Sequence, residues 1–392
     1  MNILFDDNMP YAADFFSGLG KAKAFCAGQI NGDDLARCEA LLVRSTTKVD
    51  AKLIESAPNL EYVATATAGF NHIDIQALRQ RSIKWYAAGG CNARAVAEYV
   101  TCGLFKLSVK HDFDLLSKSV GIVGVGNVGS ALSSMLQSIG MKVVEYDPPR
   151  AQRDEHFESA PFDDVLKCDV ISLHVPLVTQ GDFPTLHMFN KQILNRLYPD
   201  QILINACRGE VLSNADLLEC FEQNAHSMPR LILDCWEGEP CIDKRLLPYL
   251  SFATAHIAGH SLEGKANGTE MVYRDLCRHL NISPSLDLRQ FLPKFDSNIA
   301  FEPVLQSTSN EQGVLTIVSK VIDCMYDIEN DDSFFRRYMA KSDSFSEIRR
   351  NYPVRREWHA ARIPLDHVQG NKKAAAILEK LGFSLTNDSR CA

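Results

Sequence analysis

The chain has 392 residues, which is too long for one hydrophobic core and predicts two or three domains. Its net charge of −8 argues against nucleic acid or an anionic membrane as the main partner, because both select for basic surfaces. Neither a signal peptide nor an apolar run of about 18 residues is visible, so we expect no export and no membrane span. The twelve cysteines are scattered without a CxxC pair, which favours reduced thiols in the cytoplasm over a disulfide framework or a metal site.

Short apolar segments alternate with turns and helical stretches in the first part of the chain. Strands are predicted within residues 1–7, 40–50, 60–78 and 83–92. Strands that alternate with helices in this way indicate βαβ units and a mainly parallel sheet.

A long helical stretch follows at residues 93–110, and a second βαβ series extends to about residue 262. Residues 265–280 are helical again, and the pattern is lost near residue 290, where we expect a domain boundary. The remaining residues contain helical segments, a last short strand and the Arg-rich run "RRNYPVRREW". Such a run is most often a solvated face or an interface.

The strongest motif is a glycine-rich turn, "GIVGVGNVG", between an apolar strand and a helix. It comprises Gly124, Gly126, Asn127, Val128 and Gly129. In such a turn the first glycine permits the sharp bend, the second lets the backbone approach a pyrophosphate, and the third lets helix and strand pack closely. The next strand ends at Asp147, whose carboxylate would accept hydrogen bonds from ribose hydroxyls and repel a 2′-phosphate. The motif therefore predicts NAD rather than NADP.

Charged or titratable residues follow three later apolar strands in succession. Arg208 follows "ILINAC", the acidic residues Asp234, Glu237 and Glu239 follow "LIL", and His256 follows "FATA". Ligands bind at the carboxyl ends of strands in open α/β sheets, so we expect these side chains to line one site.

These residue types fit hydride transfer from a 2-hydroxy acid. An Arg can hold the substrate carboxylate with two hydrogen bonds, and a His can take the hydroxyl proton near neutral pH. A carboxylate beside that His would fix its tautomer. Each residue alone has an ordinary structural explanation, and only their joint order behind the glycine-rich motif supports the prediction.

At these residues the chain resembles the D-isomer-specific 2-hydroxy acid dehydrogenases, through "GIVGVGNVG", "NACRGEVL", "LDCWEGEP" and "HIAG". The resemblance implies that Arg208, Glu239 and His256 are catalytic, with Glu239 selected because it stands directly before Pro240. It implies further cofactor contacts from Val175, Ala206, Cys207, Arg208, Asp234 and Gly259. It implies substrate contacts from Ser45 and Thr67. His260 stands where the family leads us to expect an aromatic residue, and it is a further candidate for a substrate contact, with simple packing as the alternative.

The resemblance also implies an α/β fold of three domains. A Rossmann-type NAD-binding domain, residues 101–264, would be inserted in a flavodoxin-like substrate-binding domain, residues 1–100 and 265–290. A C-terminal α/β domain, residues 291–392, would make a homodimer. Within the family, "DDNMPYA", "SLEGKANGT" and "RRNYPVRREW" resemble a subgroup that oxidises 4-phospho-D-erythronate to 2-oxo-3-hydroxy-4-phosphobutanoate on the route to pyridoxal 5′-phosphate.

Two alternatives stay open at this point. The chain could be another D-2-hydroxy acid dehydrogenase, acting on 3-phosphoglycerate or hydroxypyruvate. It could also be an NAD-sensing interaction protein that keeps the fold for binding partners, because fold does not by itself determine function.

Overall fold

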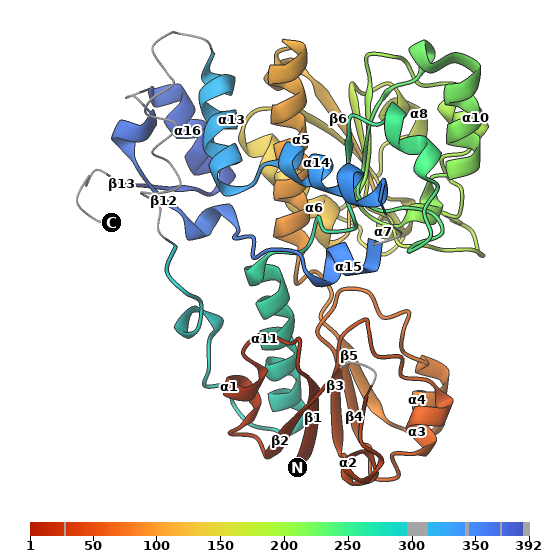
Figure 1. Cartoon of the computed structure of the whole chain (residues 1–392), viewed down its shortest axis with the longest axis vertical. Coiled ribbons are helices and arrows are strands. Elements are labelled where there is room, and N and C mark those ends of the chain that lie inside the picture. The colour runs from red at the N-terminus through yellow and green to blue at the C-terminus, as the bar shows by residue number, and fades with distance from the viewer. Residues whose placement is uncertain (27–28, 296–312, 342–344, 369–370, 387–392) are drawn as a thin grey trace. The chain divides into compact units, whose positions relative to one another are not determined.

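The computed structural model of the protein, drawn in Figure 1, describes residues 1–26, 29–295, 313–341, 345–368 and 371–386. The chain divides into two compact units, residues 1–92 with 260–294 and residues 93–259 with 295–392. Each unit is built on a parallel sheet with helices, so the predicted α/β class is confirmed. The division into three domains stays a prediction. Its boundary at residue 100 falls inside one helix, its boundary at 264 falls inside another, and part of its third domain lies outside the described residues.

The first unit contains a five-stranded parallel sheet of order β2-β1-β3-β4-β5. Its strands are β1 (Asn2–Asp6), β2 (Lys21–Phe25), β3 (Ala40–Val43), β4 (Tyr62–Thr65) and β5 (Lys84–Ala87). Its helices are α1 (Ala12–Phe16), α2 (Gly32–Arg37), α3 (Ala51–Glu55), α4 (Ile75–Gln80) and α11 (Leu262–His279). The β3 sequence "ALLV" is buried on both faces, as expected for a central strand of a covered parallel sheet.

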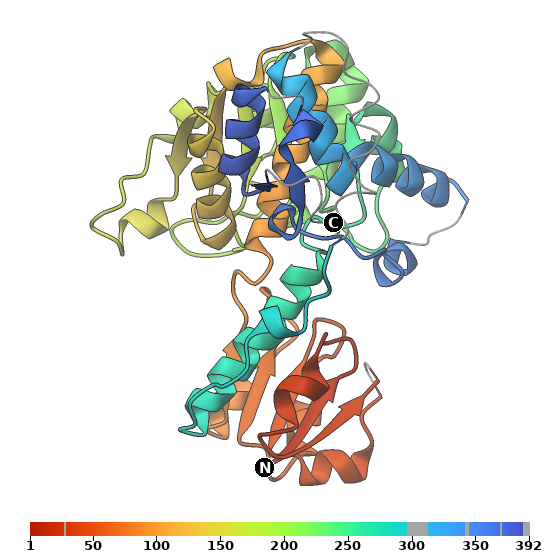
Figure 2. The same ribbon diagram turned by 90° about the vertical axis from the view of Figure 1, so that its left-hand side faces the viewer.

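Helix α11 covers one face of this sheet, and Figure 2 shows it beside the strands of the same unit. Val272, Tyr273 and Leu276 of α11 share a hydrophobic core with Ile3 of β1 and Leu42 of β3. The opposite face packs on α3 and α4. The first 92 residues therefore depend for one layer of their core on a helix that comes much later in the chain.

The second unit contains a six-stranded parallel sheet of order β11-β10-β9-β8-β6-β7. Its strands are β6 (Ser119–Val123), β7 (Lys142–Tyr146), β8 (Val170–Leu173), β9 (Ile202–Asn205), β10 (Arg230–Leu233) and β11 (Phe252–Ala253). Its helices before residue 260 are α5 (Ala93–His111), α6 (Asn127–Ser138), α7 (Pro148–Ala151), α8 (Phe162–Leu166), α9 (Lys191–Leu194) and α10 (Asn214–Asn224). The winding reverses where β6 lies between β7 and β8, and such a switch point is where these sheets bind ligands.

The C-terminal segment packs onto this same sheet unit. It consists of α13 (Val314–Met325), α14 (Ile328–Met339), α15 (Phe345–Arg350) and α16 (Lys372–Leu381), with the parallel pair β12 (Arg362–Pro364) and β13 (Ser384–Thr386). Figure 1 shows α13 beside α5, where Lys106 pairs with Asp323 at 2.8 Å and Asp327 at 3.1 Å. One hydrophobic core extends from the six-stranded sheet into the C-terminal helices.

Among the described residues, no helix has both the length and the apolar character needed to cross a membrane.

Candidate active site

The glycine-rich loop after β6 packs tightly against its neighbours at Gly124 and Gly129, and has free space at Gly126. A Cβ on Gly124, whose φ is +90°, would lie 2.8 Å from the carbonyl carbon of His174, and one on Gly129 would lie 2.0 Å from the oxygen of Gly124. A Cβ on Gly126 would meet nothing within 4 Å. Helix α6 begins at Asn127 without a side-chain cap, so its first N–H groups remain available to an anion. These features fit the pyrophosphate of NAD.

Asp147 joins the end of β7 to this loop. Its Oδ2 accepts a hydrogen bond from the N–H of Val125 at 2.8 Å, and its Oδ1 accepts one from the N–H of Arg150 at 2.9 Å. The guanidinium of Arg150 pairs with Asp154 at 3.2 Å and donates to the carbonyl of Val125 at 2.9 Å. Arg150 is thus tied to the loop and to a carboxylate rather than presented to a 2′-phosphate. The contact between Asp147 and a ribose stays a prediction.

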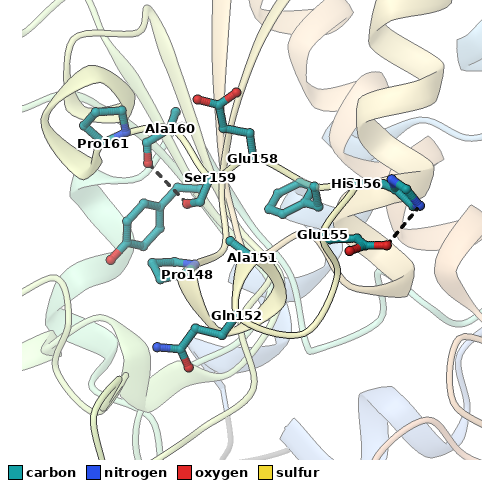
Figure 3. A pocket seen from close by; sticks show the side chains of 11 residues that line it. Pro148, Ala151, Gln152, Glu155, His156, Glu158, Ser159, Ala160 and Pro161 are labelled. Carbon is teal, nitrogen blue, oxygen red and sulfur yellow. Dashed lines mark hydrogen bonds and ion pairs between the residues drawn. The ribbon is translucent and has the colours of Figure 1, made fainter.

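An open hollow of about 890 Å³ lies beyond the end of β7, one of the two edge strands of the six-stranded sheet (Figure 3). Its lining includes Glu155, His156 and Glu158, with Gln152 on the α7 side. None of the residues predicted to touch substrate or cofactor lines it, so the candidate site lies elsewhere on the unit.

The three predicted catalytic residues follow three neighbouring strands. Arg208 follows β9, Glu239 follows β10 and His256 follows β11, and these strands are adjacent in the sheet. The Nδ1 of His256 donates to Oε2 of Glu239 at 2.8 Å, and Oε1 of Glu239 accepts from the N–H of Trp236 at 2.8 Å. In the described part of the chain, Nε2 of His256 has no hydrogen-bond partner. The pair therefore has the geometry of a base oriented by a carboxylate.

Glu239 is held in its charged form by its surroundings. Burial alone would raise its pKa, but the hydrogen bond and charge of His256, the N–H of Trp236 and the charge of Arg349 together lower the pKa of Glu239 below its ordinary value. Arg349 belongs to α15 in the C-terminal segment. A carboxylate charged at neutral pH favours the imidazolium that forms when His256 takes a proton.

The backbone at His256 adopts an unusual conformation that its neighbours fix. Its φ is +55°, in the left-handed region, which costs free energy for a non-glycine residue. Its N–H donates to the carbonyl of Asp234 at 2.7 Å. The buried carboxylate of Asp234 accepts from the N–H groups of Ile257 at 2.7 Å and Ala258 at 2.9 Å, and from the hydroxyl of Thr254 at 2.7 Å. Asp234 therefore shapes the loop that carries His256, a role the sequence did not indicate, while its cofactor contact stays a prediction.

The half-buried side chain of Arg208 is suited to an external anion. Its Nη1 donates to the carbonyl of Cys207 at 2.6 Å, and within the described residues it has no carboxylate partner. A Cβ on the following residue, Gly209, would lie 1.9 Å from the carbonyl carbon of Trp236. This close approach packs the Arg208 loop directly on the chain that leads to Glu239.

Glu237 has different partners, although it stands only two residues from Glu239. Its Oε1 accepts a hydrogen bond from Nε2 of His187, and its Oε2 accepts one from the N–H of Asn214 at 3.0 Å. The geometry thus brings Glu239, and not Glu237, to His256.

A metal at this position is disfavoured by the ligand chemistry. The side chains of Cys235, Glu239 and His256 lie close enough to share an ion. However, burial raises the pKa of the Cys235 thiol well above its ordinary value, and thiols bind metals as thiolates. The other two residues are already paired with each other.

The remaining predicted residues lie in two groups. In the second unit, Val175 follows β8 and borders Gly124, Ala206 and Cys207 follow β9, and Gly259 follows the His256 loop. In the first unit, Ser45 is exposed after β3 and Thr67 follows β4, where its hydroxyl donates to the carbonyl of Gly69 at 2.9 Å. His260 also belongs to the first unit. Their contacts with ligands stay predictions.

Two family models match the chain. Residues 94–260 match the NAD binding domain of the D-isomer specific 2-hydroxyacid dehydrogenases, and residues 302–382 match a domain of unknown function (DUF3410). The chain is 42% identical over 384 residues to the erythronate-4-phosphate dehydrogenase of Pseudoalteromonas atlantica, covering 98% of this chain and 100% of that protein. It is 41% identical over 392 residues to the protein of that name from Proteus mirabilis, covering 99% and 100%.

Solved structures share the fold at lower identity. The D-lactate dehydrogenase of Aquifex aeolicus, complexed with NAD and lactic acid, is 21% identical with a TM-score of 0.55, covering 71% of this chain and 96% of that chain. The NAD⁺-bound 3-phosphoglycerate dehydrogenase of Entamoeba histolytica is 21% identical with a TM-score of 0.59, covering 72% and 95%.

Proposed function

Because the chain belongs to the D-isomer specific 2-hydroxyacid dehydrogenase family, we propose that it oxidises 4-phospho-D-erythronate to 2-oxo-3-hydroxy-4-phosphobutanoate with NAD. The observation that carries this substrate is the length of the similarity. Relatives named erythronate-4-phosphate dehydrogenase match 98% and 99% of the chain, including its C-terminal segment. The matched dehydrogenases of other substrates cover only 71% and 72% of it.

The side chains at the three strand ends have separate roles in the proposed reaction. Arg208, which has no carboxylate partner among the described residues, holds the substrate carboxylate with two hydrogen bonds. Nε2 of His256 takes the proton of the 2-hydroxyl group, while Glu239 holds Nδ1 and favours the imidazolium. NAD, bound at the glycine-rich loop, supplies the hydride acceptor.

The proposal also includes substrate contacts from residues of the first unit. Ser45 and Thr67 follow the neighbouring strands β3 and β4, so both lie at the carboxyl edge of the five-stranded sheet. Their hydroxyl groups, together with His260, are the proposed substrate contacts from this unit. The product would enter the route to pyridoxal 5′-phosphate.

A homodimer that forms through the C-terminal segment is part of the proposal. The exposed ring pair of Phe334 and Tyr338 on α14 and the 75% exposed Val354 supply apolar surface for such a contact. Analytical ultracentrifugation of the chain and of Tyr338→Asp tests this, since a dimer that is unaffected by the substitution would place the interface elsewhere. We also propose a cytoplasmic location, because the cysteines of the described residues are all free thiols.

The deciding experiment measures NADH formation with 4-phospho-D-erythronate, 3-phosphoglycerate and D-glycerate, for the wild type and His256→Ala. Preference for 4-phospho-D-erythronate that is lost with His256 would support the substrate and the base together. Preference for another acid would keep the dehydrogenase and overturn the substrate. Absence of turnover with every acid, despite bound NAD, would favour an interaction protein.

A further inference from the structure

A buried arginine of the C-terminal segment contacts the loop that carries His256. Arg355 lies between α15 and β12, and only 7% of its surface is exposed. Its Nη2 donates to the carbonyl of Ala258, and also to the carbonyl of Ala95 in α5 at 3.2 Å. The guanidinium lies over the ring of Tyr326, 4.5 Å from the centroid. The Arg-rich run is therefore not a solvated face at this residue.

Ala258 is held from two sides. The carboxylate of Asp234 accepts hydrogen bonds from the N–H groups of Ile257 and Ala258, and so holds the backbone donors of the loop. Arg355 donates to the carbonyl of Ala258, and so holds a backbone acceptor of the same loop. His256 stands two residues earlier with its φ at +55°, and such a conformation persists only where the surroundings hold it.

The segment around Arg355 is itself anchored on the same unit. The N–H of Trp358 donates to both carboxylate oxygens of Glu98 on α5, at 3.1 Å each. Burial disfavours the charged form of Arg355, but the nearby groups Tyr352, Tyr326, Glu98 and Asp331 outweigh it and raise the pKa of the guanidinium above its ordinary value. A buried guanidinium that donates to two backbone carbonyls offsets part of the cost of its burial through those contacts, so they are structural rather than incidental.

We propose that Arg355 is a positioning residue for His256. By holding the carbonyl of Ala258, it fixes the turn that aims Nε2 of His256, so the C-terminal segment serves the chemistry of its own chain. This inference rests on the proposed function, in which His256 is the base.

The chain offers a matched control in Arg336 of α14. Its guanidinium also donates to backbone carbonyls of the sheet unit, those of Leu247 and Leu250, the latter at 2.9 Å. These carbonyls are not part of the His256 loop. Arg355→Met and Arg336→Met both remove guanidinium–carbonyl hydrogen bonds. Arg336→Met also removes an ion pair with Asp332 at 2.8 Å, but only Arg355→Met removes a contact with the His256 loop.

The test combines steady-state kinetics with amide hydrogen exchange of the peptide that covers residues 254–260. For Arg355→Met we expect kcat to fall about 10- to 100-fold with little change in KM, since a small misplacement of a catalytic group has an effect of this size. Exchange at Ile257 and Ala258 should accelerate. Arg355→Lys should recover part of kcat, and Arg336→Met should keep kcat and the exchange rates of this peptide near those of the wild type.

Unchanged kcat and exchange in folded Arg355→Met, or an equal loss of kcat in Arg336→Met, would overturn the proposal. If Arg355→Met does not fold, Arg355→Lys is compared with Arg336→Met instead, with a smaller expected loss of kcat because Lys keeps a donor for one carbonyl. If the wild type turns over none of the acids, the proposed function fails, but the exchange rates still decide whether Arg355 holds the loop.

Discussion

Replacing Glu239 by Gln separates the role of its charge from the role of its shape. Glu239 accepts from the N–H of Trp236 with one oxygen and from Nδ1 of His256 with the other. A Gln must keep its oxygen toward Trp236, because its amino group would leave that N–H without an acceptor. The amino group then faces His256 and donates to Nδ1, which places the imidazole proton on Nε2. The proposed base, His256, would then carry a proton at Nε2, the atom that should accept one.

The size of the effect follows from these contacts. A hydrogen bond to a charged group contributes about 1.5 to 3 kcal/mol, which corresponds to about 10- to 150-fold in rate. A wrong histidine tautomer in a serine protease triad lowers kcat about 10⁴-fold. We therefore expect Glu239→Gln to lower kcat between about 10²- and 10⁴-fold. The change in KM should be smaller, because Arg208, the proposed ligand of the carboxylate, is unchanged.

The assay is the rate of NADH formation from 4-phospho-D-erythronate across neutral pH. Glu237→Gln is the matched control, since Glu237 also contacts a His, namely His187, but not the proposed base. It should keep kcat within about 3-fold of the wild type. A Glu239→Gln enzyme that keeps more than a tenth of the wild-type kcat, or an equal loss in both variants, would refute the reasoning.

Three further predictions concern packing, pH and cofactor choice. Gly209→Ala should destabilise the protein by about 1 to 3 kcal/mol in urea unfolding, because the added Cβ would lie 1.9 Å from the carbonyl carbon of Trp236. An unchanged urea midpoint would contradict this close approach. Burial raises the pKa of the Asp323 carboxyl group from 3.8 to about 6, although the charge of Lys106 acts in the opposite direction. The protonated carboxyl group therefore stabilises the folded protein below about pH 4, and this stabilisation is lost as the pH rises through about 6. Asp323→Asn should remove up to about 3 kcal/mol of that pH dependence in urea midpoints, and an equal slope in both proteins would refute it. Asp147→Asn should narrow the preference for NAD over NADP about tenfold in kcat/KM, whereas an unchanged ratio would place the selectivity elsewhere.

The sequence predicted the strands and the turn that carry the candidate residues, because these depend on local pattern. The glycine-rich turn between β6 and α6 and the charged residues after β9, β10 and β11 could be located because strand, turn and helix each leave a signal within a few residues. The spacing to His256 did not by itself distinguish Glu237 from Glu239, because that choice depends on which loop residue bends toward β11.

Contacts between distant residues left no such signal. Arg355 reaches Ala258 across 97 positions, and the Arg-rich run around it has the composition of a surface. The family resemblance implied a cofactor contact for Asp234, whereas its hydrogen bonds to the His256 loop depend on the path of the backbone. Long-range pairing of this kind is fixed by tertiary packing and cannot be read from periodicity.

The first unit is built from two separate stretches of the chain, and this affects when it can fold during synthesis on the ribosome. Ile3 and Leu42 emerge early, but α11, which covers them, emerges only after all of residues 93–259 have been synthesised. During that interval one apolar face of the nascent sheet has no native partner, and such a face is prone to aggregation. We therefore expect nascent chains that stop before residue 262 to need a chaperone, and chains that extend past residue 294 to be released from it.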